Sequence, residues 1–444
     1  ITVDGISAAN SNNATTVNLT TASASSVSFS NNNSTFNALT VASGGSTSFG
    51  SGLTIATDTG KLSLDSTSIT TAGALTLTGA TGIDFGAGVT LTAGGNLAMT
   101  TTSGDISGAG AFTLTSTGNI SLSENLTTAG ATVITADSNG SGVGDLSINA
   151  STTLSTGNNS LTLKANDITV SGSLTSGTGS TTIAVSDGGT IGLGGTAGNM
   201  TLTGAELANI TAGTLNIGDS STGNITVDGI SAANSNNATT VNLTTASASS
   251  VSFSNNASTF KGLAVSSGNG ISQGVNVTTS NTTTLDADSN NDGSGDFNNT
   301  AGTISTGGSA LSITANDFGL SGSINTGTGT TTILVSDGGS IGLGSTAGNM
   351  TIAGSELGNI TAGTLTIGDS TAGAMTVNGI SSANSTNITT VDLDSSSIAF
   401  STGGSTFKGL SATANTGTIT GAVALTVAGT STFTTSASNQ SITL

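Results

Sequence analysis

Oxygen-bearing side chains that suit a hard cation are concentrated in one short stretch, residues 286–296, which reads DADSNNDGSGD. Asp288, Asn290 and Asp292 stand there at alternate positions and Gly293 follows them, as in the first half of the calcium-loop pattern D-x-[DN]-x-[DN]-G. Oxygens at this spacing are able to wrap around one ion. The sequence therefore predicts a calcium site. Its predicted ligands are Asp286, Asp288, Asn290, Asp292 and Asp296.

The match to a complete calcium loop is partial. Counted from Asp288, Asp296 falls at the ninth position, where a direct or water-mediated ligand is common, but the twelfth position holds Asn299 instead of a bidentate Glu. The corresponding stretch earlier in the chain, residues 137–145, reads DSNGSGVGD and keeps only Asp137 and Asp145 as carboxylates. An EF-hand is therefore not supported. An acidic, glycine-rich loop that protrudes from the fold without a metal stays open as the second interpretation, and neither interpretation requires a cofactor.

The composition argues against catalysis. The chain has no His, Cys or Arg and no obvious Ser–Lys pair, so a nucleophile would lack its base. The carboxylates that recur, Asp167 with Asp317 and Asp187 with Asp337, lie among Gly and Ser turn residues, and there is no Trp or Tyr to stack on a sugar. We therefore predict that the protein is not an enzyme. A polysaccharide-degrading enzyme that uses paired carboxylates is the remote alternative.

The charge of the chain limits its partners. Its 444 residues include 4 basic and 23 acidic ones, a net charge of −19. Nucleic acids and anionic membranes are bound by basic faces, so we expect neither as a partner. No apolar run approaches the ~20 residues that span a bilayer, so we expect no membrane insertion. The sequence has no starting Met and no signal peptide, which we interpret as a mature or internal part of a longer chain.

Short apolar alternations predict the elements that carry these residues. Between residues 75 and 133, pairs of apolar residues separated by one position are flanked by Gly, Asn, Asp or Ser. Every third pair recurs in register, 22 residues from Leu75 to Leu97 and 23 from Leu97 to Ile120. Three short strands in a circuit of about 22 residues predict a three-faced, right-handed parallel β-helix of about 20 coils. Tandem β-sandwiches, with ~100-residue units and a buried Trp or Tyr, are the less favoured alternative.

Longer repeats indicate how the coils are organised. Residues 1–36 and 225–260 differ at one position, and a diverged third copy begins at Met375. Residues 158–220 align with 308–370 at a constant offset of 150, which is close to seven coils. We therefore predict one continuous β-helix over residues 1–444. Its predicted parts are a partial module with additional coils (1–132), two modules (133–282 and 283–432) and the start of a further coil (433–444).

Two residue types are predicted to have set places in the coils. Asn residues at strand entries, each preceded by Gly, are interpreted as turn residues, some of which hydrogen-bond from coil to coil along the axis. The alternative, that they are glycan or ligand sites, is less favoured. These residues are Asn96, Asn119, Asn199, Asn224 and Asn349. Phe residues at repeated positions are predicted to occupy equivalent places in the core. They are Phe29 with Phe253, and Phe36 with Phe260 and Phe407.

The phrases GALTLTGATG, GGNLAMTTTSGDISG and STGNISLSENLTTAGATVITAD resemble the repeat regions of filamentous-haemagglutinin-like proteins, which are large bacterial surface proteins. The resemblance covers essentially the whole chain and implies a right-handed β-helix shaft, secretion to the bacterial cell surface and an adhesive or fibre-forming role. No binding residue of that family carries over to this sequence.

We therefore expect a non-catalytic structural or adhesive shaft of an extracellular fibre, filament or layer. Its chains are expected to associate or continue end to end, and host or cell-surface glycans are the other expected partners. A calcium-dependent module that binds glycans or surfaces is the main alternative function.

Overall fold

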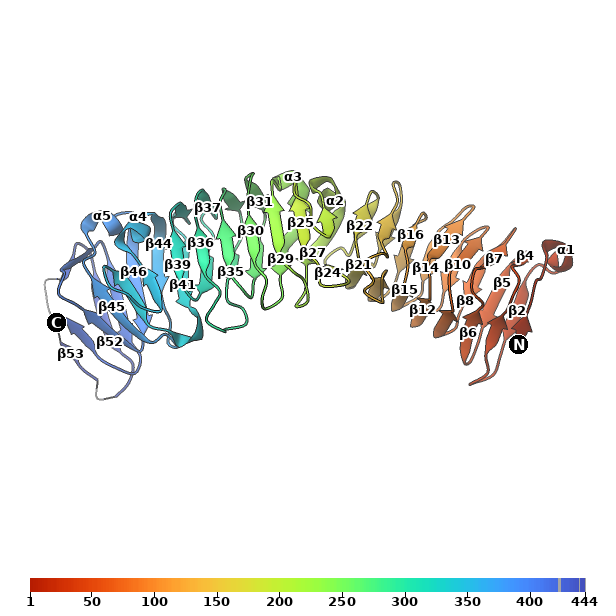
Figure 1. Cartoon of the computed structure of the whole chain (residues 1–444), viewed down its shortest axis with the longest axis horizontal. Helices are drawn as coiled ribbons and strands as arrows, with labels where there is room; N and C mark the ends of the chain where they lie inside the picture. Colours follow the sequence, from red (N-terminus) through yellow and green to blue (C-terminus); the bar gives the residue numbers. More distant parts are fainter. Residues whose placement is uncertain (422–424, 439, 444) are drawn as a thin grey trace. The chain divides into compact units, whose positions relative to one another are not determined.

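The chain folds into a parallel β-solenoid of about 20 turns in the computed structural model, which describes residues 1–421, 425–438 and 440–443 (Figure 1). It divides into two compact units. Unit 1 comprises Ile1–Ile191, Ala197–Gly218 and Asn237–Thr239, and unit 2 comprises Gly192–Thr196, Asp219–Asn236 and Thr240–Leu444. The division into modules that the repeats predict stays a prediction.

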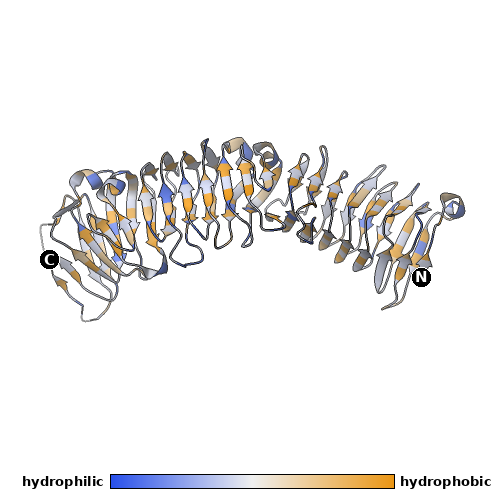
Figure 2. Cartoon of the chain, in the orientation of Figure 1, coloured by the Kyte–Doolittle hydropathy of each residue, from blue (hydrophilic) through white to orange (hydrophobic). Residues whose placement is uncertain are grey.

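Each strand forms because apolar and hydroxyl side chains alternate along it. In β10 (Leu75–Gly79), Leu75 and Leu77 are buried, whereas Thr76 and Thr78 between them are partly exposed. Successive side chains of a strand point to opposite faces, so this pattern places the leucines inside the coil and the threonines on its surface. Orange, hydrophobic bands alternate with pale bands of intermediate hydropathy along many strands in Figure 2.

The register of the coils confirms the spacing that the sequence predicts. Leu75 pairs with Leu97 and Leu97 with Ile120, 22 and 23 residues apart, and Leu91 pairs with Leu114. All these pairings are parallel, so equivalent strands of successive coils hydrogen-bond at about 4.8 Å. The prediction of a parallel β-helix built from short strands is therefore confirmed.

In unit 1 the strands form three faces. The first face contains β4 (Ser34–Phe36), β7 (Leu53–Thr57), β10, β13 (Leu97–Thr101), β16 (Ile120–Leu122), β19 (Leu146–Ile148) and β22 (Ile168–Val170). The second contains β2 (Val17–Thr20), β5 (Leu39–Ala42), β8 (Leu62–Leu64), β11 (Ile83–Phe85), β14 (Ile106–Gly108), β17 (Leu126–Thr128), β20 (Thr153–Ser155) and β23 (Ser173–Thr175). The third contains β1 (Thr2–Val3), β3 (Val27–Phe29), β6 (Ser46–Phe49), β9 (Ser68–Thr71), β12 (Val89–Ala93), β15 (Phe112–Ser116), β18 (Thr132–Thr135), β21 (Leu161–Ala165) and β24 (Ser180–Val185). The long strand β27 (Ile210–Ile217) pairs with both β23 and β24.

Unit 2 repeats this arrangement. Its first face contains β28 (Ile225–Asp228), β30 (Val251–Phe253), β33 (Ile271–Gln273), β36 (Phe297–Asn299) and β39 (Phe318–Leu320), then β42 (Ile341–Gly344), β43 (Met350–Ile352), β45 (Ala374–Asn378), β47 (Ser397–Phe400), β50 (Ile419–Gly421) and β53 (Ile442–Thr443). Its second contains β31 (Ser258–Phe260), β34 (Val277–Thr279), β37 (Thr303–Ser305), β40 (Ser323–Asn325), β48 (Ser405–Phe407) and β51 (Leu425–Val427). Its third contains β29 (Ala238–Thr244), β32 (Leu263–Ser266), β35 (Thr283–Asp286), β38 (Leu311–Ala315), β41 (Thr330–Val335), β46 (Ile388–Ser395), β49 (Leu410–Ala414) and β52 (Ser431–Thr435). Strand β44 (Ile360–Ile367) pairs with both β40 and β41. The remaining strands of the chain are β25 (Ile191–Gly194) and β26 (Met200–Leu202).

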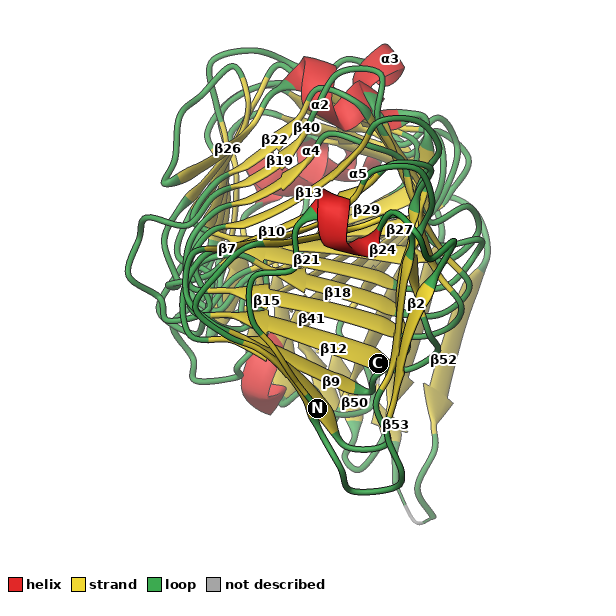
Figure 3. Ribbon diagram, turned by 90° about the vertical axis from the view of Figure 1, so that its right-hand side faces the viewer, coloured by secondary structure: helices red, strands yellow, loops and turns green. Residues whose placement is uncertain are grey.

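Short helices lie at the margins of the stacked strands (red in Figure 3). They are α1 (Ala8–Ser11), α2 (Gly204–Ala208), α3 (Ala232–Ser235), α4 (Gly354–Gly358), α5 (Ser382–Ser385) and the 3-10 turn η1 (Ser336–Gly338). Thr203 begins α2 with a capping box, in which its hydroxyl accepts from the Glu206 N–H. Glu206 also accepts from the Val170 N–H at 3.2 Å, so α2 satisfies a donor at the edge of β22. Among the described residues, no helix is long and apolar enough to cross a membrane.

The core consists of aliphatic stacks with Phe rings placed between them. Phe29 and Phe49 stack with their ring centroids 5.0 Å apart. The predicted equivalent positions are confirmed as buried, because Phe36, Phe260 and Phe407 each close a Ser-Thr-Phe strand and are at most 2% exposed. Each buried Phe ring removes a large apolar area from water, which stabilises a core that contains no Trp or Tyr.

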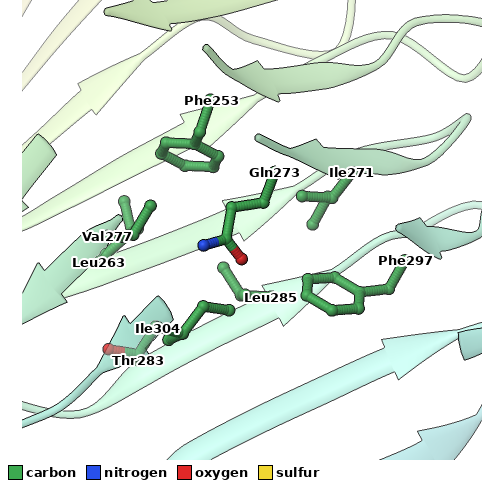
Figure 4. Close-up of a pocket in the computed structure, with 9 residues that line it drawn as sticks. All are labelled: Phe253, Leu263, Ile271, Gln273, Val277, Thr283, Leu285, Phe297 and Ile304. Carbon is green, nitrogen blue, oxygen red and sulfur yellow. The ribbon is translucent and has the colours of Figure 1, made fainter. Parts of the chain in front are cut away.

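Two amides interrupt this apolar interior in unit 2. Gln273 projects among Phe253, Phe297 and Leu285 beside a cavity of about 10 Å³, which is close to the smallest volume that holds one water (Figure 4). Its Oε1 accepts from Asn299 Nδ2 at 2.7 Å, and its Nε2 donates to the Val275 carbonyl oxygen at 2.7 Å. Both amides are therefore paired inside the coil.

Candidate calcium loop and polar ladder

The predicted calcium ligands lie on one loop of unit 2, between β35 and β36. Asp286 ends β35, Asp288, Asn290 and Asp292 follow in the loop, and Asp296 immediately precedes β36. Strand pairing fixes both ends of the loop. Before the loop, Thr283 of β35 pairs with Leu311 of β38, and after the loop, Phe297 of β36 pairs with Ile271 of β33. All five residues therefore lie in or next to one loop, and the partners of their side chains decide what they are able to bind.

Asp288 closes the loop from inside. It is fully buried, and its carboxylate accepts hydrogen bonds from the N–H groups of Asp292 and Gly293, both at 3.2 Å. The Ser336 hydroxyl, 48 residues further along the chain, donates to the same carboxylate at 2.6 Å. A buried carboxylate must have such donors, since an unpaired buried charge is very costly. Asp288 is therefore an anchor of the loop.

Asp292 and Asp296 accept hydrogen bonds in two different directions. Asp292 accepts from the Ser294 N–H at 3.1 Å and from the Ser294 hydroxyl, and Asn290 Nδ2 donates to it at 2.7 Å. Asp296 accepts from Asn316 Nδ2 and from the Asp317 N–H, both at 3.1 Å, which are groups of the next coil. The two carboxylates are thus used by different parts of the structure.

Asn290 and Asp286 complete the predicted set. Asn290 Oδ1 is buried and has no hydrogen-bond partner. Within the described part of the chain, it is the one buried side-chain nitrogen or oxygen atom of which this is true. Burial raises the pKa of Asp286. The hydrogen bond from the Asp288 N–H at 3.3 Å opposes this rise, and the nearby charge of Asp288 adds to it. Among the described residues, no group of three or more His, Cys, Asp or Glu side chains is placed to hold a metal ion. Calcium binding therefore stays a prediction.

The stretch 137–145 of unit 1 has the same internal anchor. Asp137 is fully buried and accepts from the Ser141 N–H at 2.8 Å, the Ser141 hydroxyl at 2.7 Å and the Gly142 N–H at 2.9 Å. Ser186 donates to it at 2.7 Å from 49 residues away. Burial acts to raise the pKa of Asp137, but the hydrogen bonds from Ser186, Ser141 and Gly142 together outweigh burial and hold the pKa below its ordinary value. The repeated Ser-Asp-Gly-Gly segments were the sequence signal for this partner, although sequence reasoning did not identify its role.

The repeated carboxylates considered for catalysis also have structural partners. Asp167 accepts from the Thr201 N–H at 3.0 Å, and Asp317 accepts from the Thr351 N–H at 2.8 Å. Burial raises the pKa of Asp167, and hydrogen bonds from the backbone of Thr201 and Ile168 partly offset the rise. Asp187 accepts from the Gly189 N–H at 3.1 Å within its own turn. The Asp187 carboxylate therefore stabilises its own turn, and the Asp167 and Asp317 carboxylates connect one turn to another.

Asn and Asp side chains form a ladder along the first face of unit 1. We call it the polar ladder and define its rungs as Asn96, Asn119, Asp145 and Asp167, each directly before a strand of that face. Asn96 Oδ1 accepts from the Asn119 N–H at 3.0 Å, Asn119 Oδ1 from the Asp145 N–H at 2.8 Å, and Asp145 Oδ1 from the Asp167 N–H at 3.2 Å. The prediction that some turn Asn residues bond along the axis is confirmed. Sequence reasoning missed that Asp continues the same ladder.

The other predicted turn Asn residues bond to neighbouring turns as well. Asn224 Oδ1 accepts from the Ser250 N–H at 2.9 Å. Asn199 Oδ1 accepts from the Thr190 N–H, and Asn349 Oδ1 from the Ser340 N–H, each at 2.9 Å.

No model of a known protein family matches the chain, and no curated protein or solved structure matches it either.

Proposed function

We propose that the protein is a non-catalytic structural and adhesive shaft of a bacterial surface fibre, filament or layer, located outside the cell. Its partners are other copies of the chain, associated or continued end to end, and host or cell-surface glycans. The observation that carries this proposal is the use of polar side chains within the fold. The polar ladder accepts hydrogen bonds from backbone N–H groups of neighbouring turns, and the buried carboxylate of Asp288 accepts one from the Ser336 hydroxyl two coils away, so these side chains hold coils together.

Two further arguments support a shaft. Stacked parallel coils leave hydroxyl rows on their outer surface, such as Thr90 beside Thr113 and Thr92 beside Thr115, and carry few charges there. The texture of the sequence resembles filamentous-haemagglutinin-like surface proteins, which implies the same location and role. A polysaccharide-degrading enzyme is less well supported, because the carboxylates it would use accept hydrogen bonds from the backbone of turns.

Imaging of intact cells tests the proposal. Antibodies raised against residues 1–444 are expected to label appendages or a layer on non-permeabilised cells of the source organism, and negative-stain images of purified native material are expected to show fibres. An antibody against a cytoplasmic protein is the control for intact cells. Label that appears only after permeabilisation would overturn the location, and purified material that shows no fibre or layer would overturn the role.

Calcium binding by residues 286–296 is the second candidate function, and the buried, unpaired Asn290 Oδ1 favours it. A hard cation would be an appropriate partner for this oxygen and for the neighbouring Asp292 carboxylate. We expect calcium to raise the melting temperature of the protein and to bind in calorimetry, and Asp292→Asn to weaken both effects. Asp187→Asn, a matched change at an exposed turn, is the control. Equal calcium responses in the two variants would exclude the loop as the site.

A further inference from the structure

Unit 2 has a corresponding row of Asn and Asp side chains on its first face, and this row is interrupted. Asn224 Oδ1 accepts from the Ser250 N–H at 2.9 Å, and further along the same face Asp296 Oδ1 accepts from the Asp317 N–H at 3.1 Å. Between these rungs the ladder positions are held by Ser250 and Gly270, each directly before a strand. Neither residue has the carboxamide or carboxylate that continues the ladder in unit 1.

Strand register identifies the residue of unit 1 that corresponds to Gly270. Ile120 pairs with Leu146, and Ile271 pairs with Phe297, each at the first residue of its strand. Asn119 and Gly270 precede these residues, so Gly270 stands where unit 1 has the rung Asn119.

The replacement of Asn by Gly changes both the backbone and the hydrogen bonds. Gly270 has φ of +101°, which favours glycine, and its N–H donates to the Ala287 carbonyl oxygen at 2.8 Å. In unit 1 the Asp145 N–H donates to Asn119 Oδ1 at 2.8 Å. Within the described part of the chain, no acceptor takes the place of Asn119 for the corresponding Asp296 N–H. A Cβ at Gly270 would lie 3.0 Å from the Asp296 carbonyl oxygen and 3.5 Å from this nitrogen, so the two backbone segments approach each other closely and no side chain of residue 270 covers the N–H.

A surface groove of about 240 Å³ occupies this place, over β30, β33 and β36. Its lining residues are Ser250, Asn269, Gly270, Ile271, Ser272, Ser294, Asp296 and Asn298. Hydroxyl and carboxamide groups and one carboxylate therefore surround the unpaired N–H, and the lining contains no cationic side chain. The groove is smaller than the ~300–1,000 Å³ of sites for drug-sized ligands, so it suits one small polar unit.

We propose that this groove binds one ring of a neutral carbohydrate, with a sugar hydroxyl oxygen in the place that Asn119 Oδ1 occupies in unit 1. A hydroxyl both accepts and donates, so it accepts from the Asp296 N–H and donates to the Asp296 carboxylate. Asn269, Asn298 and Ser272 then bond to the neighbouring hydroxyls of the ring. The carboxylate and the net charge of −19 select against anionic sugars.

A single groove of this kind binds weakly. It offers no aromatic ring for stacking, so we expect a dissociation constant of about 1 mM, which corresponds to about −4 kcal/mol. Many copies of the chain in one fibre would strengthen binding to a glycan-covered surface without new contacts. The choice of a glycan as the ligand rests on the proposed adhesive function, and the groove adds the residues that would contact that glycan.

Saturation-transfer NMR on the full chain tests the inference. The probes are glucose, galactose, mannose and N-acetylglucosamine, with glucuronate as the anionic comparison. We expect saturable signal for at least one neutral sugar, a weaker signal for glucuronate, and loss of the neutral-sugar signal in Ser272→Leu, which fills the groove with an apolar side chain. Ser121→Leu is the matched control, because Ser121 holds the position in unit 1 that Ser272 holds in unit 2.

Two results would overturn the inference. One is the absence of a saturable signal for every neutral sugar, and the other is an equal signal in Ser272→Leu and Ser121→Leu. Asn298→Ala removes a hydrogen-bonding group at an exposed position and is expected to weaken the signal. This variant provides a second test if Ser272→Leu does not fold. These outcomes are independent of cell-surface labelling, so the groove and the proposed shaft function fail separately.

Discussion

The Ser336 hydroxyl donates a 2.6 Å hydrogen bond to the buried carboxylate of Asp288, although 48 residues separate them. Asp288 follows β35 and Ser336 follows β41, and strand β38 pairs with both, so the bond joins turns that are two coils apart. Ser186 and Asp137 make the same contact in unit 1 at 2.7 Å. Backbone ladders connect each coil only to its neighbours, so these bonds add a tie of longer range.

The tie at Asp137 predicts a pH dependence of stability. Hydrogen bonds from Ser186, Ser141 and Gly142 together outweigh burial and hold the pKa of Asp137 below its ordinary value of 3.8. A pKa that is lower in the folded state than in the unfolded state contributes stability above the unfolded value, and this stability is lost as the pH falls through the folded value. We therefore expect Asp137→Asn to lower the melting temperature at neutral pH, and the difference from the native protein to shrink below pH 3.8.

Calorimetry at a series of pH values checks this prediction. Asp58→Asn, at an exposed position, is the matched control and is expected to leave the melting temperature almost unchanged at neutral pH. A difference between native protein and Asp137→Asn that grows toward acid pH would show that the sign is wrong.

The fold was predictable because every coil repeats the same local signal. The spacing from Leu75 to Leu97 equals the register of β10 with β13, since a parallel coil must return each apolar residue above its equivalent. The burial of Phe36 and Phe260 was predictable for the same reason, because each ends an alternating strand. Contacts between turns, such as Asp288 with Ser336, do not follow from a local period, because they depend on how far each loop extends.

Phe260→Asp is expected to destabilise the protein by several kcal/mol. Phe260 is 2% exposed, so the substitution removes about 3–5 kcal/mol of aromatic packing and buries a charge without a partner. Thr259→Asp, on the adjacent outward-facing position of β31, is the matched control and is expected to cost less than about 1 kcal/mol. Denaturant unfolding measures both, and equal costs would show that the assigned faces of β31 are reversed.

The interior amide pair predicts a coupling between two substitutions. Asn299→Leu leaves Gln273 Oε1 buried without its 2.7 Å donor and is expected to cost about 1–3 kcal/mol. Adding Gln273→Leu removes the unpaired acceptor, so the double variant is expected to be more stable than Asn299→Leu alone. A double-mutant cycle in denaturant measures the coupling energy. Costs that simply add would show that the two amides act independently.

The candidate site was predictable only in part, and the polar ladder shows why. Asp288, Asn290 and Asp292 lie on one loop, but a sequence pattern does not tell whether a carboxylate faces an ion or a backbone N–H. The absence of a rung at Gly270 became informative only after strand register had aligned it with Asn119. Single glycines are too common in this chain, at 66 residues, for one of them to be significant in the sequence alone.

Removal of a ladder rung is expected to weaken unit 1 by a measurable but small amount. Asn119→Ala leaves the Asp145 N–H without its 2.8 Å acceptor, and water is able to replace it in part because Asn119 is exposed. The expected cost is therefore about 1 kcal/mol, near the net value of one hydrogen bond. Hydrogen exchange should locate the effect, with faster exchange of the Asp145 amide and unchanged exchange in unit 2. Asn13→Ala, at an exposed turn outside the ladder, is the matched control. Unchanged protection of the Asp145 amide in Asn119→Ala would mean that the polar ladder contributes nothing to the stacking of coils. It would also mean that Gly270, which stands in unit 2 where unit 1 has Asn119, has no consequence for the neighbouring N–H.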